Sequence, residues 1–238
     1  TYGGSAGTPS YTAPEGTLTT SVTYAKKDGT NLTGIPAEAG DYTVTVVCET
    51  KDTIYSGSAD YTINPKPISD VDSYLDKTGF TYNGGEQKPN LTVKMNDTVF
   101  RESIDYTVTY PTDMTSAGTK EIKISGIGNF SGEKTVSYQI NKATVKVKPK
   151  NISKIYGTEP KFMLESDSPL ITEAELEKVV ASAMFTSGGT EKTAPVTANG
   201  YVISAQLASS ENTDINLSLI FEVDGTGVLT VEKADLTI

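Results

Sequence analysis

The chain of 238 residues repeats itself, and this constrains its fold more than any other feature of the sequence. One phrase occurs three times, and each copy reads as a strand, a short polar link with a lysine, and a second strand. The copies are Tyr61–Ile68, Tyr138–Val145 and Leu229–Leu236. The phrase predicts repeat boundaries near Pro65 and Lys142, giving repeats at residues 1–65, 66–142 and 143–233 and the start of a following module at 234–238.

Two further phrases recur in the same order within the repeats. A tyrosine followed by polar residues and a proline opens each repeat, at Tyr2 to Pro9, Tyr82 to Pro89 and Tyr156 to Pro160. A glycine turn then starts an alternating strand, at Ala39-Gly40, Ala117-Gly118 and Asn199-Gly200, because glycine supplies the backbone freedom of a turn. In the third copy Tyr201 follows the glycine directly, which predicts a turn shifted by one residue.

Apolar and polar residues alternate around Val108 and again around Val136, which is the period of a strand with one buried face. The chain is rich in tyrosine, with 13 copies, and aromatic side chains suit a pleated surface. We therefore predict a mainly β fold: a tandem, end-to-end array of three small β-rich modules, Ig-like or β-grasp-like. The opening strand of the first module would precede Thr1, so the chain reads as an excerpt of a longer array.

One short helix is predicted, in the third repeat near residues 173–185. Thr172 and Glu175 have the spacing of a capping box at its start. Four apolar residues then form a stripe along one helical face, which predicts that the helix packs on a sheet: Leu176, Val179, Val180 and Ala183. Ser187-Gly188-Gly189 is expected to end it.

Strand periodicity also predicts which side chains point inward. Cys48 is in phase with Tyr42, Val44 and Val46, so we expect a small buried hydrophobic residue and not a reactive thiol. Ile122 and Ile124 hold the same register in the second repeat.

Two repeated tyrosines are predicted to be core residues with their hydroxyls near polar groups, and not a platform for a ligand. Tyr61 alternates with Ala59 and Ile63, and the equivalent Tyr138 alternates with Val136 and Ile140. The apolar neighbours indicate that these faces point inward.

The composition excludes several kinds of chemistry. The chain has no His, one Cys and no Trp, which removes His-based triads, His- or Cys-rich metal sites and internal disulfides. A net charge of −10 argues against a nucleic-acid partner. No cofactor, no transition metal and no catalytic residue are therefore expected, and we predict that the chain is not an enzyme.

Three remaining possibilities are weak. Asp70, Asp72 and Asp76 follow the first boundary, but they lack the glycine and closing glutamate of an EF-hand and read as a solvated acidic turn. Paired carboxylates for glycoside hydrolysis would need a cleft that a small repeated module has little room for. A Lys–Asn bond catalysed by a carboxylate would need a trio that no spacing singles out.

Six Asn-x-Ser/Thr sequons occur, at Asn31, Asn90, Asn96, Asn129, Asn151 and Asn216. Their number exceeds the chance expectation only mildly. We interpret them as polar strand edges and turns rather than as sites of glycosylation.

Several of these phrases are familiar. Phe80-Thr-Tyr82-Asn-Gly84, Asp105–Tyr110, Gly126–Gly132 and Tyr138-Gln-Ile140 resemble the tandem repeats of Gram-positive surface proteins. The third repeat, with Ile155-Tyr-Gly157, the Asn199 turn and Val223–Val231, is similar to MBG-type (Tyr-Gly) adhesin repeats. The resemblance covers nearly the whole chain. It implies an extracellular, cell-wall-linked protein whose repeats form a stalk, and it carries no catalytic residues.

We therefore expect non-catalytic spacer repeats of a bacterial cell-surface protein, whose partners are the neighbouring repeats and whose recognition domain lies elsewhere. The alternative is a module that itself binds a glycan or a host protein. An exposed aromatic patch on one module would favour the alternative, and burial of nearly all tyrosines would favour the spacer. No apolar run is long enough to span a membrane.

Overall fold

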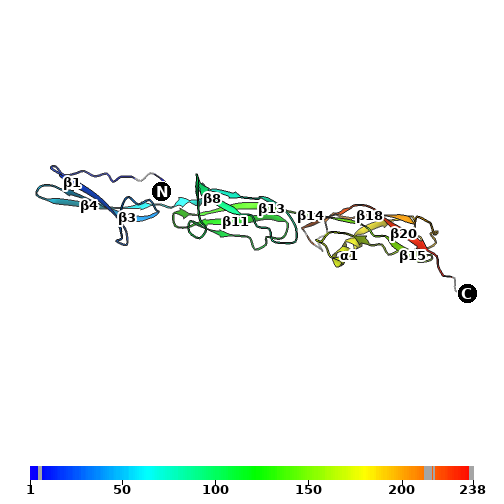
Figure 1. The fold of residues 1–238 in the computed structure, drawn as a ribbon. Helices are drawn as coiled ribbons and strands as arrows, with labels where there is room; N and C mark the ends of the chain where they lie inside the picture. Colours follow the sequence, from blue (N-terminus) through cyan, green and yellow to red (C-terminus); the bar gives the residue numbers. More distant parts are fainter. Residues whose placement is uncertain (5–6, 212–215, 217, 236–238) are drawn as a thin grey trace. The chain divides into compact units, whose positions relative to one another are not determined.

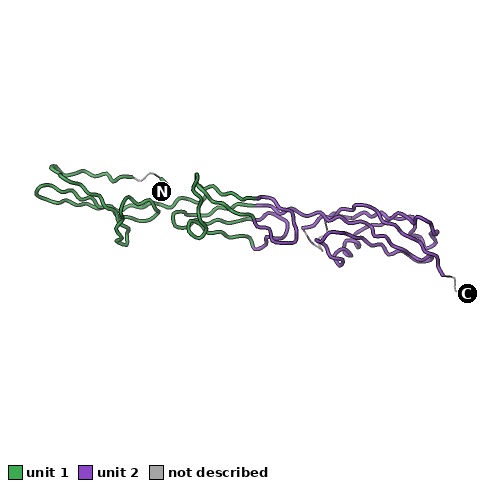
Figure 2. Tube along the Cα trace, viewed as in Figure 1, with its two compact units in different colours: residues 1–76, 89–111, 121–137 green, residues 77–88, 112–120, 138–238 purple. Residues whose placement is uncertain are grey.

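The computed structural model describes the chain except for residues 5–6, 212–215, 217 and 236–238. It divides into two compact units, coloured separately in Figure 2. Unit 1 comprises residues 1–76, 89–111 and 121–137, and unit 2 comprises residues 77–88, 112–120 and 138–238. The predicted mainly β fold with several sheets is confirmed (Figure 1). The division into three modules stays a prediction, and most of the predicted fourth start, residues 236–238, lies outside the described residues.

Unit 1 consists of strands and one short 3₁₀ helix. Its elements are β1 (Thr19–Lys26), β2 (Asn31–Leu32), β3 (Gly40–Glu49), β4 (Ile54–Ile63), β5 (Lys66–Pro67), η1 (Ile68–Asp70), β6 (Asp72–Leu75), β8 (Leu91–Met95), β9 (Thr98–Val99), β10 (Tyr106–Thr109) and β12 (Phe130–Ser131). Strands β11 (Gly118–Gly126) and β13 (Glu133–Asn141) run through both units.

The first sheet of unit 1 has the order β2-β1-β3-β4 and is antiparallel. Cys48 on β3 is 4% exposed, as predicted, and its Sγ lies 3.7 Å from the Thr20 hydroxyl oxygen. A separate core in unit 1 gathers around Ile124 and Phe130 from β11 and β12. Ile122 and Ile124 are fully buried, which confirms the inward register predicted for β11.

The prediction for Tyr61 is wrong. Tyr61 is only half-buried.

Ala59, beside it on β4, is exposed, and Ile63 is half-buried. Strand β4 is the last strand of its sheet in the described chain, so Tyr61 has a neighbouring strand on one side only, where its ring lies 5.6 Å from that of Tyr42. Its hydroxyl is buried and has no hydrogen-bond partner among the described residues, and burial raises the pKa of this phenol.

Unit 2 contains the only α-helix of the described chain. Its elements are β7 (Gly79–Thr81), β14 (Ala143–Pro149), β15 (Ile152–Ile155), β16 (Leu164–Glu165), α1 (Glu173–Ala181), β17 (Ala183–Thr186), β18 (Tyr201–Leu207), β19 (Leu219–Val223) and β20 (Gly227–Glu232). One sheet has the order β16-β14-β19 and another the order β15-β20-β18-β17. Within the described residues, no helix is long and apolar enough to cross a membrane.

Helix α1 begins as predicted. The Thr172 hydroxyl accepts from the Glu175 amide at 3.3 Å, and the Glu175 carboxylate accepts from the Thr172 amide at 2.8 Å, which completes the capping box. Leu176 and Val179 belong to the core with β14 and β19, so the prediction that the stripe packs on a sheet is confirmed.

The predicted end of the helix is wrong. The helix ends at Ala181, and Ser182 caps it by donating its hydroxyl to the Val179 carbonyl at 2.8 Å. Ala183 starts strand β17 because it pairs with Leu207 on β18, so Ser187-Gly188-Gly189 follows a strand and not the helix.

Tyr138 is the core residue that the sequence predicts. It is 2% exposed, and its hydroxyl donates to the Gln87 carbonyl at 2.8 Å. Strand β7 pairs with the end of β13, and Phe80 on β7 places its ring 5.6 Å from that of Tyr138. Tyr138 therefore packs against Phe80 of the neighbouring strand β7, whereas β4, which carries Tyr61, has no neighbouring strand on the corresponding side in the described chain.

We predict that Tyr138→Ala destabilises unit 2 by about 3–5 kcal/mol, because it removes a buried ring and leaves a cavity. The matched Tyr61→Ala change should cost only about 1–2 kcal/mol, since that ring is half exposed already. Urea unfolding of both variants measures the difference. Equal losses would contradict the assignment of the two rings to different environments.

Candidate functional site

The tyrosine that opens each repeat makes the same backbone hydrogen bond. The amides of Tyr2, Tyr82 and Tyr156 each donate at 2.8 Å to the carbonyl of the residue that follows or ends the closing strand. The acceptors are Asn64, Asn141 and Glu232, respectively. The sequence phrase therefore has one geometry at all three of its positions.

Strand direction explains where this tyrosine lies. In unit 2 the strands directly before the opening tyrosines, β7 and β15, run parallel to the closing strands β13 and β20, with Thr81 opposite Asn141 and Ile155 opposite Glu232. The opening tyrosine consequently lies at the end where the chain leaves the repeat. In unit 1, Gly40 lies opposite Ile63, so the glycine turn lies at the corresponding end.

In unit 1, one asparagine bonds to both sides of the first repeat boundary. The Asn129 side-chain oxygen accepts from the Ala39 amide at 2.7 Å, and its side-chain nitrogen donates to the Glu38 carboxylate. The Asn129 carbonyl accepts from the Lys66 amide at 2.9 Å. Asn129 thereby joins the glycine turn of the first repeat to the opening strand of the second.

The loop that carries Asn129 is held by a close backbone approach. A Cβ on Gly126 would lie 2.7 Å from the Ser131 nitrogen, so a larger residue would push the loop away. Phe130 is paired in parallel with Lys66 through β12 and β5, and its ring forms an edge contact with Tyr2 at 5.4 Å. The opening tyrosine of the first repeat therefore packs against the core that follows the boundary.

In unit 2, Ser218 takes the part that Asn129 has in unit 1. Its hydroxyl oxygen accepts from the Ala117 amide at 2.7 Å, and its carbonyl accepts from the Ala143 amide at 2.9 Å. The serine is 2% exposed. Two residues earlier, the Asn216 side chain donates to the Tyr82 hydroxyl at 2.9 Å and accepts from the Ser218 amide at 2.8 Å.

These boundary contacts were not predicted from the sequence. The opening tyrosine and the glycine turn both recur in the sequence, but the pattern of the turn predicts only the start of a strand and not a contact across the boundary. The residues that bond to it differ between the two boundaries, asparagine at 129 and serine at 218, so a search for identical phrases does not find them. The signal that could have indicated a contact at each boundary is that both phrases recur in the same order before every closing strand.

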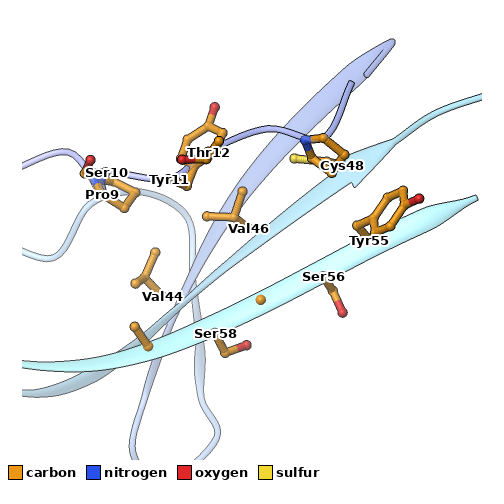
Figure 3. A pocket seen from close by; sticks show the side chains of 13 residues that line it. Pro9, Ser10, Tyr11, Thr12, Val44, Val46, Cys48, Tyr55, Ser56 and Ser58 are labelled. Carbon is orange, nitrogen blue, oxygen red and sulfur yellow. The ribbon is translucent and has the colours of Figure 1, made fainter. Parts of the chain in front are cut away.

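A groove lies elsewhere in unit 1, between the first sheet and the segment from Pro9 to Pro14 (Figure 3). Its volume is about 350 Å³. The β3 side chains Val44, Val46 and Cys48 line it, and β4 contributes small residues such as Gly57, so the groove is mainly apolar. No charged residue lines it.

Two tyrosines line this groove, Tyr11 from the covering segment and Tyr55 from β4. They are 47% and 48% exposed. Four of the 13 tyrosines are buried, Tyr24, Tyr42, Tyr106 and Tyr138, and four are exposed, Tyr11, Tyr55, Tyr74 and Tyr156. Burial of nearly all tyrosines, which would favour the spacer, is therefore not found, and two of the exposed tyrosines, Tyr11 and Tyr55, line the same groove.

The three aspartates after the first boundary are exposed, and Asp76 accepts from the Asn90 amide and side chain at 2.8 and 2.7 Å. In the described part of the chain, no three His, Cys, Asp or Glu side chains are placed to hold a metal ion.

The side chains of the sequon asparagines mostly serve the fold. Asn90 bonds to Asp76, Asn129 and Asn216 bond at the boundaries, and Asn151 accepts from the Val228 amide at 2.8 Å. Asn31 and Asn96 are exposed.

Two lysines of the described chain are buried. Lys120 is bonded to Asp113 at 2.9 Å, and Lys154 donates to the backbone carbonyls of Thr190 and Glu191. The hydrogen-bond partners of these two ammonium groups within the described chain are thus a carboxylate and two backbone carbonyls.

Asp113 holds the turn that leads to Ala117. Its carboxylate accepts from the amides of Ser116 and Thr115 and from the Lys120 ammonium, all at 2.9 Å. The Ser116 amide first, and then the lysine, hold the pKa of this carboxyl well below its usual range.

No protein-family model and no curated protein matches the chain. Among solved structures, it is similar to SGBP-B of the mixed-linkage glucan utilization locus of Bacteroides ovatus, in complex with a mixed-linkage heptasaccharide, with 13% identity and a TM-score of 0.18. It is also similar to the zebrafish RET cadherin-like domains 1 to 4, with 7% identity and a TM-score of 0.18. The matches cover 89% and 90% of this chain but only 61% and 65% of those chains. Likenesses this distant support no inference about this chain.

We predict that Asp113→Asn lowers the melting temperature of unit 2 at pH 7. The ionised carboxylate stabilises the folded chain above the unfolded-state pKa of about 3.9, and this contribution is lost as the pH falls toward the lower folded-state pKa. The melting temperatures of parent and variant should therefore draw together as the pH falls below about 3.9, and coincide only below the much lower folded-state pKa. Asp52→Asn, in an exposed loop, is the control and should match the parent throughout. A difference that persists unchanged in acid would contradict the role of the Asp113 carboxylate.

Proposed function

We propose that the chain is a set of non-catalytic spacer repeats from a bacterial cell-surface protein. The repeats would form a stalk that presents an adhesive or enzymatic domain located elsewhere in a longer protein. Their main partners would be the neighbouring repeats of the same chain, and neither a cofactor nor nucleic acid would take part.

The observation that carries this proposal is the repeated boundary contact. Asn129 and Ser218 each accept the amide of an alanine on one side of a boundary and, through the carbonyl, an amide on the other side. The four bonds are 2.7 or 2.9 Å long. Each such bond contributes a net of about 0.5–1.5 kcal/mol, so the two bonds at each boundary favour contact between the segments on its two sides.

The extracellular location is supported by the sequence. The resemblance to Gram-positive surface repeats and to MBG-type adhesin repeats implies it. A single buried cysteine also leaves the chain without internal disulfides, which suits such surface proteins.

We predict that Asn129→Ala weakens the first boundary. Loss of the side-chain oxygen leaves the Ala39 amide without its acceptor, so hydrogen exchange at Ala39 should accelerate roughly tenfold, equivalent to about 1.4 kcal/mol. Amide exchange followed by NMR measures this. Asn31→Ala is the matched control, because Asn31 is exposed on β2 and the chemical change is the same. Equal exchange at Ala39 in the two variants would remove the support for a boundary contact.

Binding of a neutral oligosaccharide is a second candidate function, favoured by the groove in unit 1. Tyr11 and Tyr55 present half-exposed rings beside an apolar floor, which is an arrangement suited to the apolar face of a sugar.

If the groove binds an oligosaccharide, Tyr55→Ala should weaken the affinity at least about tenfold, because the ring contact is lost. Tyr74→Ala is the control, since Tyr74 is equally exposed but does not line the groove. Calorimetric titration with a panel of neutral glucan oligosaccharides measures both. Absence of binding to the parent chain, or equal loss in both variants, would exclude this candidate and leave the spacer proposal unaffected.

A further inference from the structure

The third repeat carries the same two boundary elements as the first and second. The Tyr156 amide donates to the Glu232 carbonyl at 2.8 Å, as Tyr2 and Tyr82 do at their closing strands. The glycine turn of the third repeat contains Asn199-Gly200, and strand β18 follows it from Tyr201.

Strand pairing identifies the equivalent of Ala39 in the third repeat. Tyr42 is paired with Tyr61, and Tyr201 is paired with Leu229. Tyr61 and Leu229 begin equivalent copies of the closing phrase, so Tyr201 takes the position of Tyr42. Ala198, three residues before Tyr201, therefore takes the position of Ala39, which also shows the one-residue shift predicted for this turn.

These positions are covered at the first two boundaries and uncovered at the third. Tyr2 packs on Phe130, Tyr82 bonds to Asn216, and the amides of Ala39 and Ala117 have side-chain acceptors. Tyr156 is 44% exposed. Ala198 is exposed, and its amide donates no hydrogen bond within the part of the chain that the structure describes.

We propose that Tyr156 and the Ala198 turn form a docking face for one further β-module of the same repeat class, joined through Ala234. Lys233-Ala234 repeats the dipeptide Lys142-Ala143, and the Ala143 amide donates to the residue that bonds the turn before it, Ser218. The incoming module therefore presents a side-chain oxygen, from serine or asparagine, to the Ala198 amide. A second side chain of that module contacts Tyr156, as Phe130 contacts Tyr2 and Asn216 contacts Tyr82.

This inference rests on the proposed function, because it takes the partner to be another spacer repeat. It adds to that function a specific surface, two residues that form it, and the chemistry of the residue that binds there. The exposed tyrosine of the third repeat is thus assigned to a contact between modules and not to a glycan.

The test is a longer chain in which a second copy of residues 142–238 follows Glu232. The Lys-Ala dipeptide at the new boundary is then the same as in the parent chain. Hydrogen exchange at Ala198 should slow at least tenfold relative to the parent, because the copied Ser218 supplies the missing acceptor. Ser218→Ala in the copy alone should abolish the slowing, and Tyr156→Ala should reduce it without changing the melting temperature of the unextended chain.

The matched control is Ser218→Ala at the original position, which should accelerate exchange at Ala117 and leave Ala198 slow. If Ala198 exchanges as fast in the longer chain as in the parent while Ala117 responds to its own serine, the docking face is wrong and the spacer function stands. If Ala117 does not respond either, the boundary contact that carries the spacer proposal fails as well.

Discussion

The pairing of the closing strand with the strand directly before the opening tyrosine is the constraint on which the rest of this structure depends. Because β7 and β15 run parallel to β13 and β20, the opening tyrosine lies beside the residue at which the chain leaves the repeat. The glycine turn reaches the same end because its strand runs antiparallel to the closing strand. Residues far apart in sequence are thereby gathered at one edge, where the following segment begins.

The contacts at that edge use the least specific chemistry that suffices. Each boundary needs one side-chain oxygen to accept a backbone amide, and both asparagine and serine provide it, at residues 129 and 218. Unpaired amides near a buried surface are costly, so an acceptor of either type satisfies the turn. The identity of the acceptor is consequently free to differ between boundaries while the geometry stays the same.

The sequence predicted the features that depend on local periodicity and missed those that depend on neighbouring strands. The capping box at Thr172 and the burial of Cys48 followed from spacing along one element. Tyr61 and Tyr138 have the same alternating neighbours, but only Tyr138 has Phe80 of a second strand beside it, and alternation alone does not show this.

The same limit applies to the end of the helix and to the candidate sites. Ala183 fits the helical stripe, yet its pairing with Leu207 makes it the start of a strand. The groove joins Tyr11 to Tyr55, and the boundary contacts join Ala39 to Asn129 and Ala117 to Ser218. The bonded pairs at the two boundaries are 90 and 101 residues apart, so no short window of sequence contains both partners.

The parallel pairing of the first strand of a repeat also determines how the repeat responds to tension. When a tandem chain is pulled, the force enters a repeat through its first strand and leaves through its last strand. In the third repeat the first strand is β14, which is paired in parallel with β19 from Ala143 with Leu219 to Val147 with Val223, so pulling on Ala143 draws β14 along β19. The interstrand bonds are then loaded in shear and must break together, whereas bonds at the open end of a hairpin break one after another. The parallel pair that contains the first strand of the repeat is therefore its mechanical clamp.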